Sequence, residues 1–330
     1  MEENTANERT YMKIVFMEAN TLGKDVSLEA FSKLGDVTIY PLTEPLENAK
    51  RIKDADIIVV NKIPLNEELL KDATNLKLIC LTATGTNNVD FEYTNRRGIT
   101  VANVKGYSTE SVVQHTFALF FYVYEKLAYY DEFVKSGEYI KNDVFSHFTV
   151  RFHELAGKTW GIIGLGTIGT RVAEVAKAFG CNVIYYSTSG KHDSETYERV
   201  SLEELLNRSD VVSIHAPLNS ATKEMITKRE LSLMKKDAIL LNLGRGPIIR
   251  EADLAEALLA GTISGAGLDV LSVEPMLPDN PLYAVQDSAR LVITPHIGWA
   301  TTEARQRCAD EVLENIKAWM NGEKRNVVTA

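Results

Sequence analysis

Cysteine is scarce in this chain of 330 residues, which contains Cys80, Cys181 and Cys308. The three lie far apart, and neither a Cys-X-X-Cys pair nor a cysteine–histidine spacing typical of zinc sites occurs. We therefore expect neither a disulfide framework nor a metal centre. Isolated cysteines of this kind are usually small buried hydrophobic residues. Unpaired thiols are typical of the reducing cytoplasm, where we expect the protein to function.

Long apolar runs and an excess of positive charge are also lacking. The longest apolar run, Phe117–Tyr124, falls far short of the roughly 20 residues that a membrane-spanning helix needs. The formal net charge is -9, from 45 acidic and 36 basic side chains, which argues against a broad surface for phosphate backbones. We expect neither a membrane nor a nucleic acid as a partner. Residues 1–10 are polar, and we expect them to form an extension outside the fold.

The remaining composition is ordinary for a globular protein, with 45% hydrophobic and 25% charged residues. At roughly 100–200 residues per domain, the length predicts two domains. Short β-branched runs alternate with amphipathic stretches over residues 12–102 and again from residue 158 onward. Strands that alternate with helices form parallel sheets covered by helices. We therefore predict an α/β fold with doubly wound parallel sheets.

This alternation places the individual elements. Strands are predicted at Lys13–Met17, Val37–Tyr40, Ile57–Val60, Lys77–Leu81 and Thr100–Ala102, and then at Thr159–Ile163, Asn182–Tyr186, Val211–His215, Ala238–Leu241, Gly265–Leu268 and Leu291–Ile293. Helices are predicted at Ser27–Leu34, Asn66–Asp72, Phe91–Arg97, Thr167–Phe179, Ser201–Asn207, Lys228–Leu233, Glu251–Leu259 and Thr301–Gly322. A long aromatic-rich helix is predicted over Thr109–Lys135, ending at Ser136-Gly137, with one face in the core and another at an oligomer interface.

A glycine-rich turn, Gly164-Leu165-Gly166-Thr167-Ile168-Gly169, follows a predicted strand and opens a predicted helix. In this context the spacing is typical of dinucleotide binding. Gly164 permits the tight turn, Gly166 lets a pyrophosphate approach the backbone, and Gly169 lets the helix pack closely on the strand. The free N–H groups at the helix start, together with its partial positive charge, favour the phosphates.

The acid that usually binds the ribose 2′-hydroxyl of NAD is missing after the next strand. Ser187 stands at that position, followed by Thr188, Ser189, Gly190 and Lys191. Without a carboxylate, nothing repels a 2′-phosphate, whereas a serine could equally bind the hydroxyl of NAD. Both NAD(H) and NADP(H) therefore stay open as the cofactor.

Three further segments with reactive side chains follow consecutive predicted strands. Arg245 lies between two glycines, Glu274 precedes Pro275, and His296 follows Pro295. Ligands bind at the carboxyl ends of strands in doubly wound sheets, so these three side chains could converge near a nicotinamide. A fixed guanidinium can bind a carboxylate, and a histidine paired with a carboxylate can transfer a proton.

Taken together, these segments resemble the D-isomer-specific 2-hydroxyacid dehydrogenases, and most of all their glycerate dehydrogenase (hydroxypyruvate reductase) branch. The resemblance extends from Met12 to about Gly322. It is carried by the glycine-rich turn and by residues 84–90, 106–116, 154–159, 242–246 and 294–301. Arg250 and Leu271 depart from the family pattern, as does the missing acid. Formate dehydrogenases share the fold but have a glutamine where this chain has Glu274.

The resemblance implies roles for individual residues. His296 would be the general acid that protonates the keto oxygen, Glu274 would orient its imidazole and favour its protonated form, and Arg245 would bind the substrate carboxylate. Thr84 and Gly85 would offer backbone N–H groups to the substrate, with Lys62 a weaker candidate for the same pocket. The residues expected to bind the cofactor are Gly164, Gly166, Thr167, Ile168, Gly169, Tyr186, Ser187, His215, Ala216, Pro217, Thr222, Leu243, Gly244, Arg245, Asp269, His296 and Gly298. Asp269 would hold the nicotinamide carboxamide, whereas His115, His147, His153 and His192 match no motif and are read as structural or exposed.

The same resemblance implies two Rossmann-like or flavodoxin-like lobes, with the cofactor domain inserted into the substrate domain. Residues 1–106 and 299–330 would form the discontinuous substrate domain, and residues 107–298 the dinucleotide-binding domain, with the active site in the cleft. The family builds a homodimer on the helix predicted at 109–135. The expected reaction is reduction of hydroxypyruvate or glyoxylate. The alternatives are a D-lactate or other D-2-hydroxyacid dehydrogenase and a non-catalytic NAD(H)-sensing scaffold.

Overall fold

The computed structural model describes residues 11–191 and 193–329 and divides the chain into two compact units. Unit 1 contains Met1–Ser108 and Ala300–Ala330, and unit 2 contains Thr109–Trp299. The extension predicted at residues 1–10 and His192, predicted to be structural or exposed, lie outside the described residues. The chain thus leaves unit 1 once, forms the whole of unit 2, and returns.

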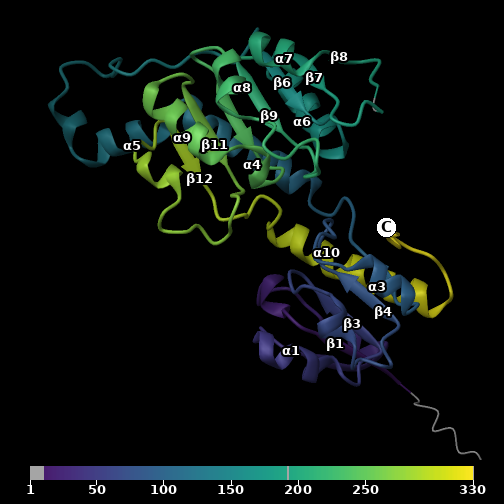
Figure 1. Cartoon of the computed structure of the whole chain (residues 1–330). Coiled ribbons are helices and arrows are strands. Elements are labelled where there is room, and N and C mark those ends of the chain that lie inside the picture. Colours follow the sequence, from purple (N-terminus) through teal and green to yellow (C-terminus); the bar gives the residue numbers. More distant parts are fainter. Residues whose placement is uncertain (1–10, 192, 330) are drawn as a thin grey trace, which may run out of the picture. The chain divides into compact units, whose positions relative to one another are not determined.

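Unit 1 is built on a five-stranded parallel sheet in the order β2-β1-β3-β4-β5. This order is that of flavodoxin-like folds. The central strands are buried at every position because helices cover both faces of the sheet. α10 ends the chain within this unit, next to β4 (Figure 1). The elements are β1 Met12–Phe16, β2 Gly35–Ile39, α1 Pro45–Ile52, β3 Ile57–Val60, α2 Glu67–Leu70, β4 Leu78–Leu81, α3 Phe91–Arg96, β5 Thr100–Ala102 and α10 Thr302–Met320, with 3-10 turns at Ala19–Thr21 and Glu29–Lys33.

Unit 2 is built on a seven-stranded sheet in the order β12-β11-β10-β9-β6-β7-β8, with all pairings parallel. The strand order reverses at β6, which lies between β7 and β9. The elements are α4 Thr109–Tyr124, α5 Leu127–Lys135, β6 Thr159–Ile163, α6 Thr167–Ala178, β7 Asn182–Tyr186, β8 Glu198–Arg199, α7 Leu202–Arg208, β9 Val211–Ile214, α8 Lys228–Leu233, β10 Ile239–Asn242, α9 Glu251–Ala260, β11 Gly265–Leu268 and β12 Leu291–Ile293, with 3-10 turns at Glu138–Lys141, Gly246–Ile248 and Pro281–Ala284. The predicted fold class, two doubly wound parallel α/β sheets, is confirmed.

The prediction of one continuous helix over Thr109–Lys135 is wrong. Lys126 adopts a left-handed backbone (φ 58°) and separates α4 from α5. Its ammonium group donates to the carbonyl oxygen of Ala289 at 3.0 Å, which ties the break to the loop before β12. The aromatic pattern continues through this break, so periodicity could not reveal it. The predicted stop at Ser136-Gly137 is confirmed, since Gly137 is left-handed (φ 83°).

The smaller differences between the predicted and the observed elements have local causes. The helix predicted at Ser27–Leu34 is a 3-10 turn over Glu29–Lys33. Helix α1 was not predicted, although Pro45 occupies its first position, where a missing N–H costs nothing. Strand β8 has two residues and pairs only along β7, so it carries too little pattern to be recognised.

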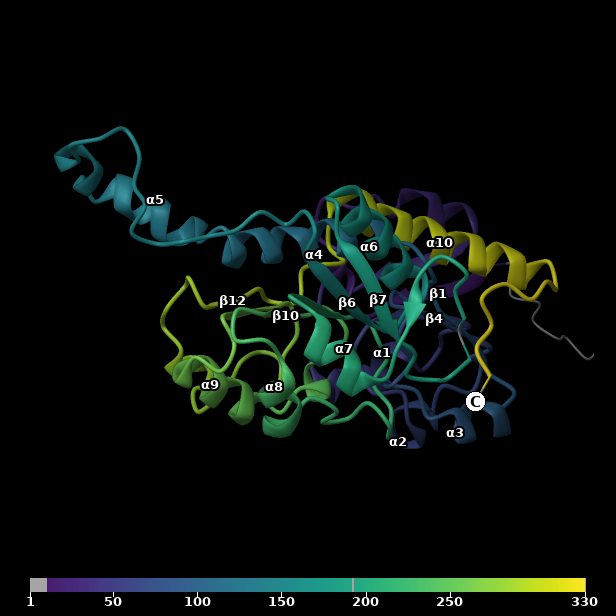
Figure 2. The ribbon, with the colours of Figure 1, turned by 90° about the horizontal axis from the view of Figure 1, so that it is seen from above.

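An aromatic core lies between α4 and the sheet of unit 2. The rings of Phe117 and Phe120 each lie 4.9 Å from that of Trp160, whose indole N–H donates to Ser213 Oγ at 2.8 Å. In contrast, α5 buries no residue. It extends with its following loop away from the seven-stranded sheet, as seen in Figure 1 and from a second direction in Figure 2.

The three cysteines are free and buried, as predicted. Burial raises the pKa of Cys181 to about 11 and that of Cys308 to about 12, so neither thiol is a ready nucleophile. Over the described residues, no helix combines the length and apolarity needed to cross a membrane. The same part of the chain shows no cluster of metal-ligating side chains.

Helix α9 offers a matched test of the core of unit 2. Leu254 is fully buried, whereas Leu259 on the same helix is 61% exposed. We expect Leu254→Ala to lower the free energy of unfolding by about 2–5 kcal/mol, because it leaves a cavity. Leu259→Ala should change it by about 0.5 kcal/mol or less. Urea unfolding followed by circular dichroism measures both, and equal losses would contradict this packing.

Candidate active site

The register of three neighbouring strands brings the predicted catalytic segments to one edge of the sheet. Asn242 of β10 pairs with Leu268 of β11, and Leu268 pairs in turn with Ile293 of β12. The three strands therefore end at the same level. The loops that follow them carry Arg245, Glu274 and His296. Gly246 allows the loop that bears Arg245 to pack closely against the loop that bears Glu274, since a Cβ there would lie 1.9 Å from the carbonyl carbon of Leu271.

Glu274 and His296 form a direct pair. The imidazole Nδ1 lies 2.7 Å from Glu274 Oε2, and Glu274 Oε1 accepts the backbone N–H of Leu271 at 3.0 Å. An ionised carboxylate can only accept, so Nδ1 carries the proton and Nε2 is the nitrogen left for other chemistry. The two side chains are 25% and 34% exposed, which keeps them accessible to a ligand.

The loop that bears Arg245 is shaped by a buried amide. Asn242 is 1% exposed; its Nδ2 donates to the carbonyl oxygen of Arg245 and its Oδ1 accepts the N–H of Gly244, both at 3.0 Å. The Arg245 guanidinium donates to the carbonyl oxygen of Gly244 at 2.8 Å. A Cβ on Gly244 would lie 2.9 Å from the carbonyl oxygen of Ala216, so this loop packs tightly beside β9.

Asp269 holds the turn that follows His296. Its Oδ1 accepts from Thr294 Oγ1 at 2.7 Å and from the N–H of Ile297 at 2.8 Å, and its Oδ2 accepts from the N–H of Gly298 at 2.7 Å. Burial pushes the pKa of Asp269 upward, but the hydrogen bonds outweigh it and hold the pKa below its ordinary value. The carboxylate is therefore ionised and largely committed to this turn.

The glycine-rich turn has the geometry that each glycine was expected to provide. Gly164 is left-handed (φ 95°), and a Cβ on Gly169 would lie 2.2 Å from the carbonyl oxygen of Gly164. Nothing lies within 4 Å of a Cβ placed on Gly166, so the backbone there is open to a ligand. Gly166 caps α6, which begins with Thr167 and Ile168.

Two residues that were predicted to bind the cofactor have polar side-chain atoms without a hydrogen-bond partner. Ser187, 6% exposed, has no hydrogen-bond partner for Oγ, and neither ring nitrogen of His215 has one. Burial lowers the pKa of His215 to about 3, so the ring is neutral. Thr222 is fully buried, and its hydroxyl donates to the carbonyl oxygen of Pro217 at 2.7 Å, so it shapes its own loop. The other predicted residues here are partly buried Tyr186 at the end of β7, buried Ala216 after β9, and Leu243 after β10.

The predicted substrate contacts Lys62, Thr84 and Gly85 belong to unit 1. The N–H of Lys62 donates to Glu18 Oε2 at 2.9 Å, together with those of its two neighbours in the chain. Thr84 follows β4; its hydroxyl donates to the carbonyl oxygen of Val104 at 2.7 Å. Their role in binding substrate stays a prediction.

Sequence reasoning missed three residues of this site. Asn242 and Thr294 lie in segments that carry the family resemblance but were predicted to have no role of their own, and His115 was predicted to be structural or exposed. His115 Nε2 lies 2.8 Å from Thr294 Oγ1 and 3.4 Å from Asp269 Oδ1, although His115 is far from both residues in the sequence. No local signal could show this contact. His147 instead stacks on Phe133 at 3.8 Å, outside the site.

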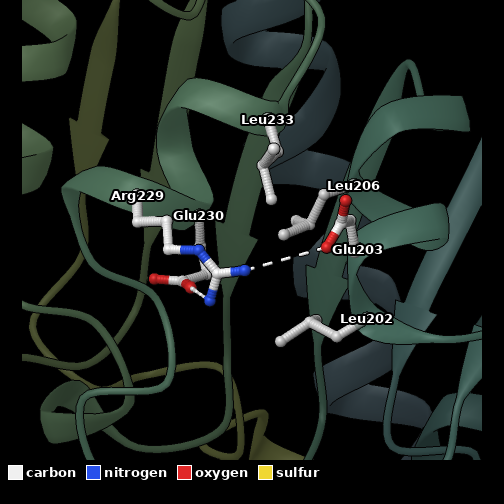
Figure 3. A pocket seen from close by; sticks show the side chains of 6 residues that line it. All are labelled: Leu202, Glu203, Leu206, Arg229, Glu230 and Leu233. Atoms are coloured by element: carbon white, nitrogen blue, oxygen red, sulfur yellow. Dashed lines mark ion pairs between the residues drawn. The ribbon is translucent and has the colours of Figure 1, made fainter.

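A separate hollow of about 180 Å³ lies between α7 and α8, lined by three leucines and spanned by charged side chains. Arg229 reaches across it toward Glu203, at 3.7 Å, and also pairs with Glu230 (Figure 3). None of the predicted site residues lines it, and we regard it as an imperfection in the packing of the two helices.

Comparison with known proteins identifies the family. Residues 117–298 match the model of the D-isomer specific 2-hydroxyacid dehydrogenase NAD-binding domain. The glycerate dehydrogenase of Methylorubrum extorquens is 36% identical over 96% of this chain and 99% of its own length. Two solved structures are each 31% identical. The D-lactate dehydrogenase of Aquifex aeolicus, complexed with NAD and lactic acid, has a TM-score of 0.80 and covers 94% of this chain and 96% of its own. The acyclic imino acid reductase Bsp5, in complex with NADPH and D-Arg, has a TM-score of 0.85 and covers 96% of this chain and 100% of its own.

Sheet order, the glycine-rich turn, the paired imidazole and carboxylate, and these matches agree with one another, and the chain belongs to the D-isomer-specific 2-hydroxyacid dehydrogenases, which are NAD(P)-dependent oxidoreductases.

Proposed function

We propose that this protein reduces a small 2-keto acid, hydroxypyruvate or glyoxylate, to the D-2-hydroxy acid with NADH or NADPH, and catalyses the reverse oxidation. The observation that carries this proposal is the 2.7 Å contact between His296 Nδ1 and Glu274 Oε2 at the end of neighbouring strands β11 and β12. Such a pair supplies an oriented proton donor at the strand ends, where doubly wound folds bind their ligands.

His296 acts as the general acid in reduction. Its Nε2–H gives a proton to the keto oxygen while the carbonyl carbon gains a hydride, so no free alkoxide forms. Glu274 keeps the proton on Nδ1 and stabilises the imidazolium before transfer. The N–H of Leu271 in turn fixes the carboxylate, so the group that orients the imidazole is itself held in place. In oxidation the neutral ring accepts the proton instead.

Arg245 binds the substrate carboxylate. Its guanidinium donates one N–H to the carbonyl oxygen of Gly244. Because a guanidinium has five N–H donors, others are available for a ligand. The fixed fork can hold a carboxylate by two parallel hydrogen bonds and stabilise charge that develops on the neighbouring carbonyl. Asn242 supports this role because it sets the backbone on both sides of the arginine.

The residues around the glycine-rich turn fit a dinucleotide. The open space beside Gly166 and the N-terminus of α6 suit a pyrophosphate, and the unpartnered Oγ of Ser187 suits a ribose hydroxyl or a 2′-phosphate. A bound reduced nicotinamide supplies the hydride. We leave the choice between NAD(H) and NADP(H) open, because a neutral serine replaces the acid that would repel the extra phosphate.

The preference for hydroxypyruvate and glyoxylate rests on the glycerate dehydrogenase relative. D-lactate is the second candidate, favoured by the structural likeness to the Aquifex aeolicus D-lactate dehydrogenase. A non-catalytic NAD(H)-sensing scaffold would not need an ordered imidazole–carboxylate pair, and the intact pair argues against it. Three buried, unpaired thiols support a cytoplasmic location.

We further propose that two copies associate through α4, α5 and the loop that follows. This segment exposes large apolar side chains outside any core, including Ile140 (87% exposed), Phe145 (90%) and Phe148 (81%). A concentration of apolar surface of this kind is typical of protein interfaces. An open hollow of about 450 Å³ beside it, lined by Phe121, Phe152 and their neighbours, could receive side chains of the second copy.

The central test compares wild type with His296→Ala. We expect the wild type to reduce hydroxypyruvate and glyoxylate faster than pyruvate, and the variant to lose about 10²- to 10⁴-fold in kcat, the usual contribution of a general acid. Binding of the reduced cofactor, measured by fluorescence titration, should change little. Leu46→Ala, at a side chain 96% exposed on α1, is the control. Full activity of His296→Ala would refute the assignment.

Gly166→Val tests the open backbone at the cofactor turn. A Cβ placed on Gly166 has nothing within 4 Å beyond its own chain neighbours, so we expect the variant to fold with a melting temperature close to that of wild type. We expect its Kd for NAD(P)H to rise about tenfold or more, equivalent to about 1.4 kcal/mol, because the valine occupies space needed by the pyrophosphate. Calorimetric titration measures the Kd. Unchanged affinity in a folded variant would place the cofactor elsewhere.

The proposed dimer is tested by sedimentation velocity. Wild type should sediment as a dimer, and the double variant Phe145→Asp/Phe148→Asp as a monomer, because two buried carboxylates oppose association. Leu46→Asp, at a side chain 96% exposed on α1, should remain dimeric and serves as the control. A monomeric wild type, or a double variant that stays dimeric, would exclude this interface.

A further inference from the structure

A chain of hydrogen bonds connects helix α4 with the turn that carries His296. His115 projects from α4 with a side chain 18% exposed, and its Nε2 lies 2.8 Å from Thr294 Oγ1. Thr294 Oγ1 lies in turn 2.7 Å from Asp269 Oδ1. All three residues belong to unit 2, although they come from α4, the end of β11 and the end of β12.

The single hydroxyl proton of Thr294 determines which group donates and which accepts along this chain. Thr294 has a single hydroxyl proton, and the ionised carboxylate of Asp269 can only accept, so the hydroxyl donates to Asp269. Both neighbours of His115 Nε2 can then only accept, which places a proton on that nitrogen; Thr294 Oγ1 at 2.8 Å is its nearer acceptor, and Asp269 Oδ1 lies at 3.4 Å. The alternative acceptor for the hydroxyl, the carbonyl oxygen of Leu268, is 3.5 Å away and much the weaker partner.

Asp269, the last residue of this hydrogen-bonded chain, stabilises an unfavourable backbone conformation at His296. His296 is left-handed (φ 55°), a conformation that is unfavourable for a residue with a side chain. Asp269 offsets the cost by accepting the N–H groups of Ile297 and Gly298, the two residues that follow. The orientation of the Asp269 carboxylate thus sets the position of the His296 backbone, and through it that of the imidazole.

Close packing makes His115 a direct part of this arrangement. A Cβ on Gly298 would lie 2.7 Å from Asp269 Oδ2 and 3.3 Å from His115 Cδ2, so the turn is held between the two side chains. From the first turn of α4, Ser111 Oγ also donates to the carbonyl oxygen of Gly298 at 2.6 Å. Helix α4 therefore contacts the turn at two points.

We propose that His115 is a positioning residue for His296: by donating Nε2–H to Thr294, it orients Thr294 and Asp269 so that Asp269 holds the left-handed turn in which His296 lies. This inference rests on the proposed role of His296 as the general acid. It assigns His115 no contact with substrate or cofactor. The effect acts on proton transfer, and substrate binding is left to other residues.

The test compares His115→Leu, which has no donor, with His115→Gln, whose amide N–H can replace that of the imidazole. We expect His115→Leu to lower kcat about tenfold to a hundredfold with little change in substrate KM, because a small displacement of the acid is costly. His115→Gln should recover most of kcat. With cofactor deuterated at the transferred position and in D₂O, isotope effects on kcat should rise in His115→Leu, since the chemical step becomes slower.

Thr294→Val breaks the same chain at its middle with little change in shape and serves as the second variant should His115→Leu fold poorly. It should lower kcat as His115→Leu does, and the double variant should lose little more, because both act through one chain. Equal kcat values for the leucine and glutamine variants, or additive losses in the double variant, would overturn the proposal. His296→Ala, assayed in parallel, distinguishes this failure from that of the proposed function, since an active His296→Ala would refute the function itself.

Discussion

The parallel pairing of β10, β11 and β12 is the constraint on which the rest of the site depends. Because Asn242, Leu268 and Ile293 are in register, three loops leave the sheet at one level. A slip of the register by one residue would also turn each strand's side chains to the opposite face, which the buried core forbids. Burial of the strands' apolar side chains thus fixes the register, and the register fixes where Arg245, Glu274 and His296 can lie.

Within that frame, three polar side chains shape the loops. Asn242 sets the backbone around Arg245, Asp269 holds the turn after His296, and Glu274 is itself held by the N–H of Leu271. Each accepts backbone N–H groups that no strand or helix pairs. Breaking one member of such a network leaves the others unsatisfied, which is why its effect extends beyond a single contact.

Much of the fold could be predicted because many of its strands and helices have a recognisable pattern of neighbouring residues. Strands such as Ile57–Val60 and Thr159–Ile163 are short β-branched runs between turn residues, and their observed bounds agree with the predicted ones. The break at Lys126 could not be predicted, since the aromatic pattern continues through it and the contact that accompanies it is with the distant carbonyl of Ala289. Strand β8 likewise exists only because β7 offers an edge to pair with.

By itself, the sequence determined the class of protein: the alternation of strands and helices, the glycine-rich turn, and the side chains Arg245, Glu274 and His296 after consecutive strands. Tertiary structure alone decided which ring nitrogen of His296 meets Glu274, that His296 lies in a left-handed turn, and that His115 reaches Thr294 and Asp269 from a helix far earlier in the chain. The physical reason is that periodicity and turn chemistry are properties of neighbouring residues, whereas hydrogen bonds between loops depend on strand register and on how α4 packs against the sheet.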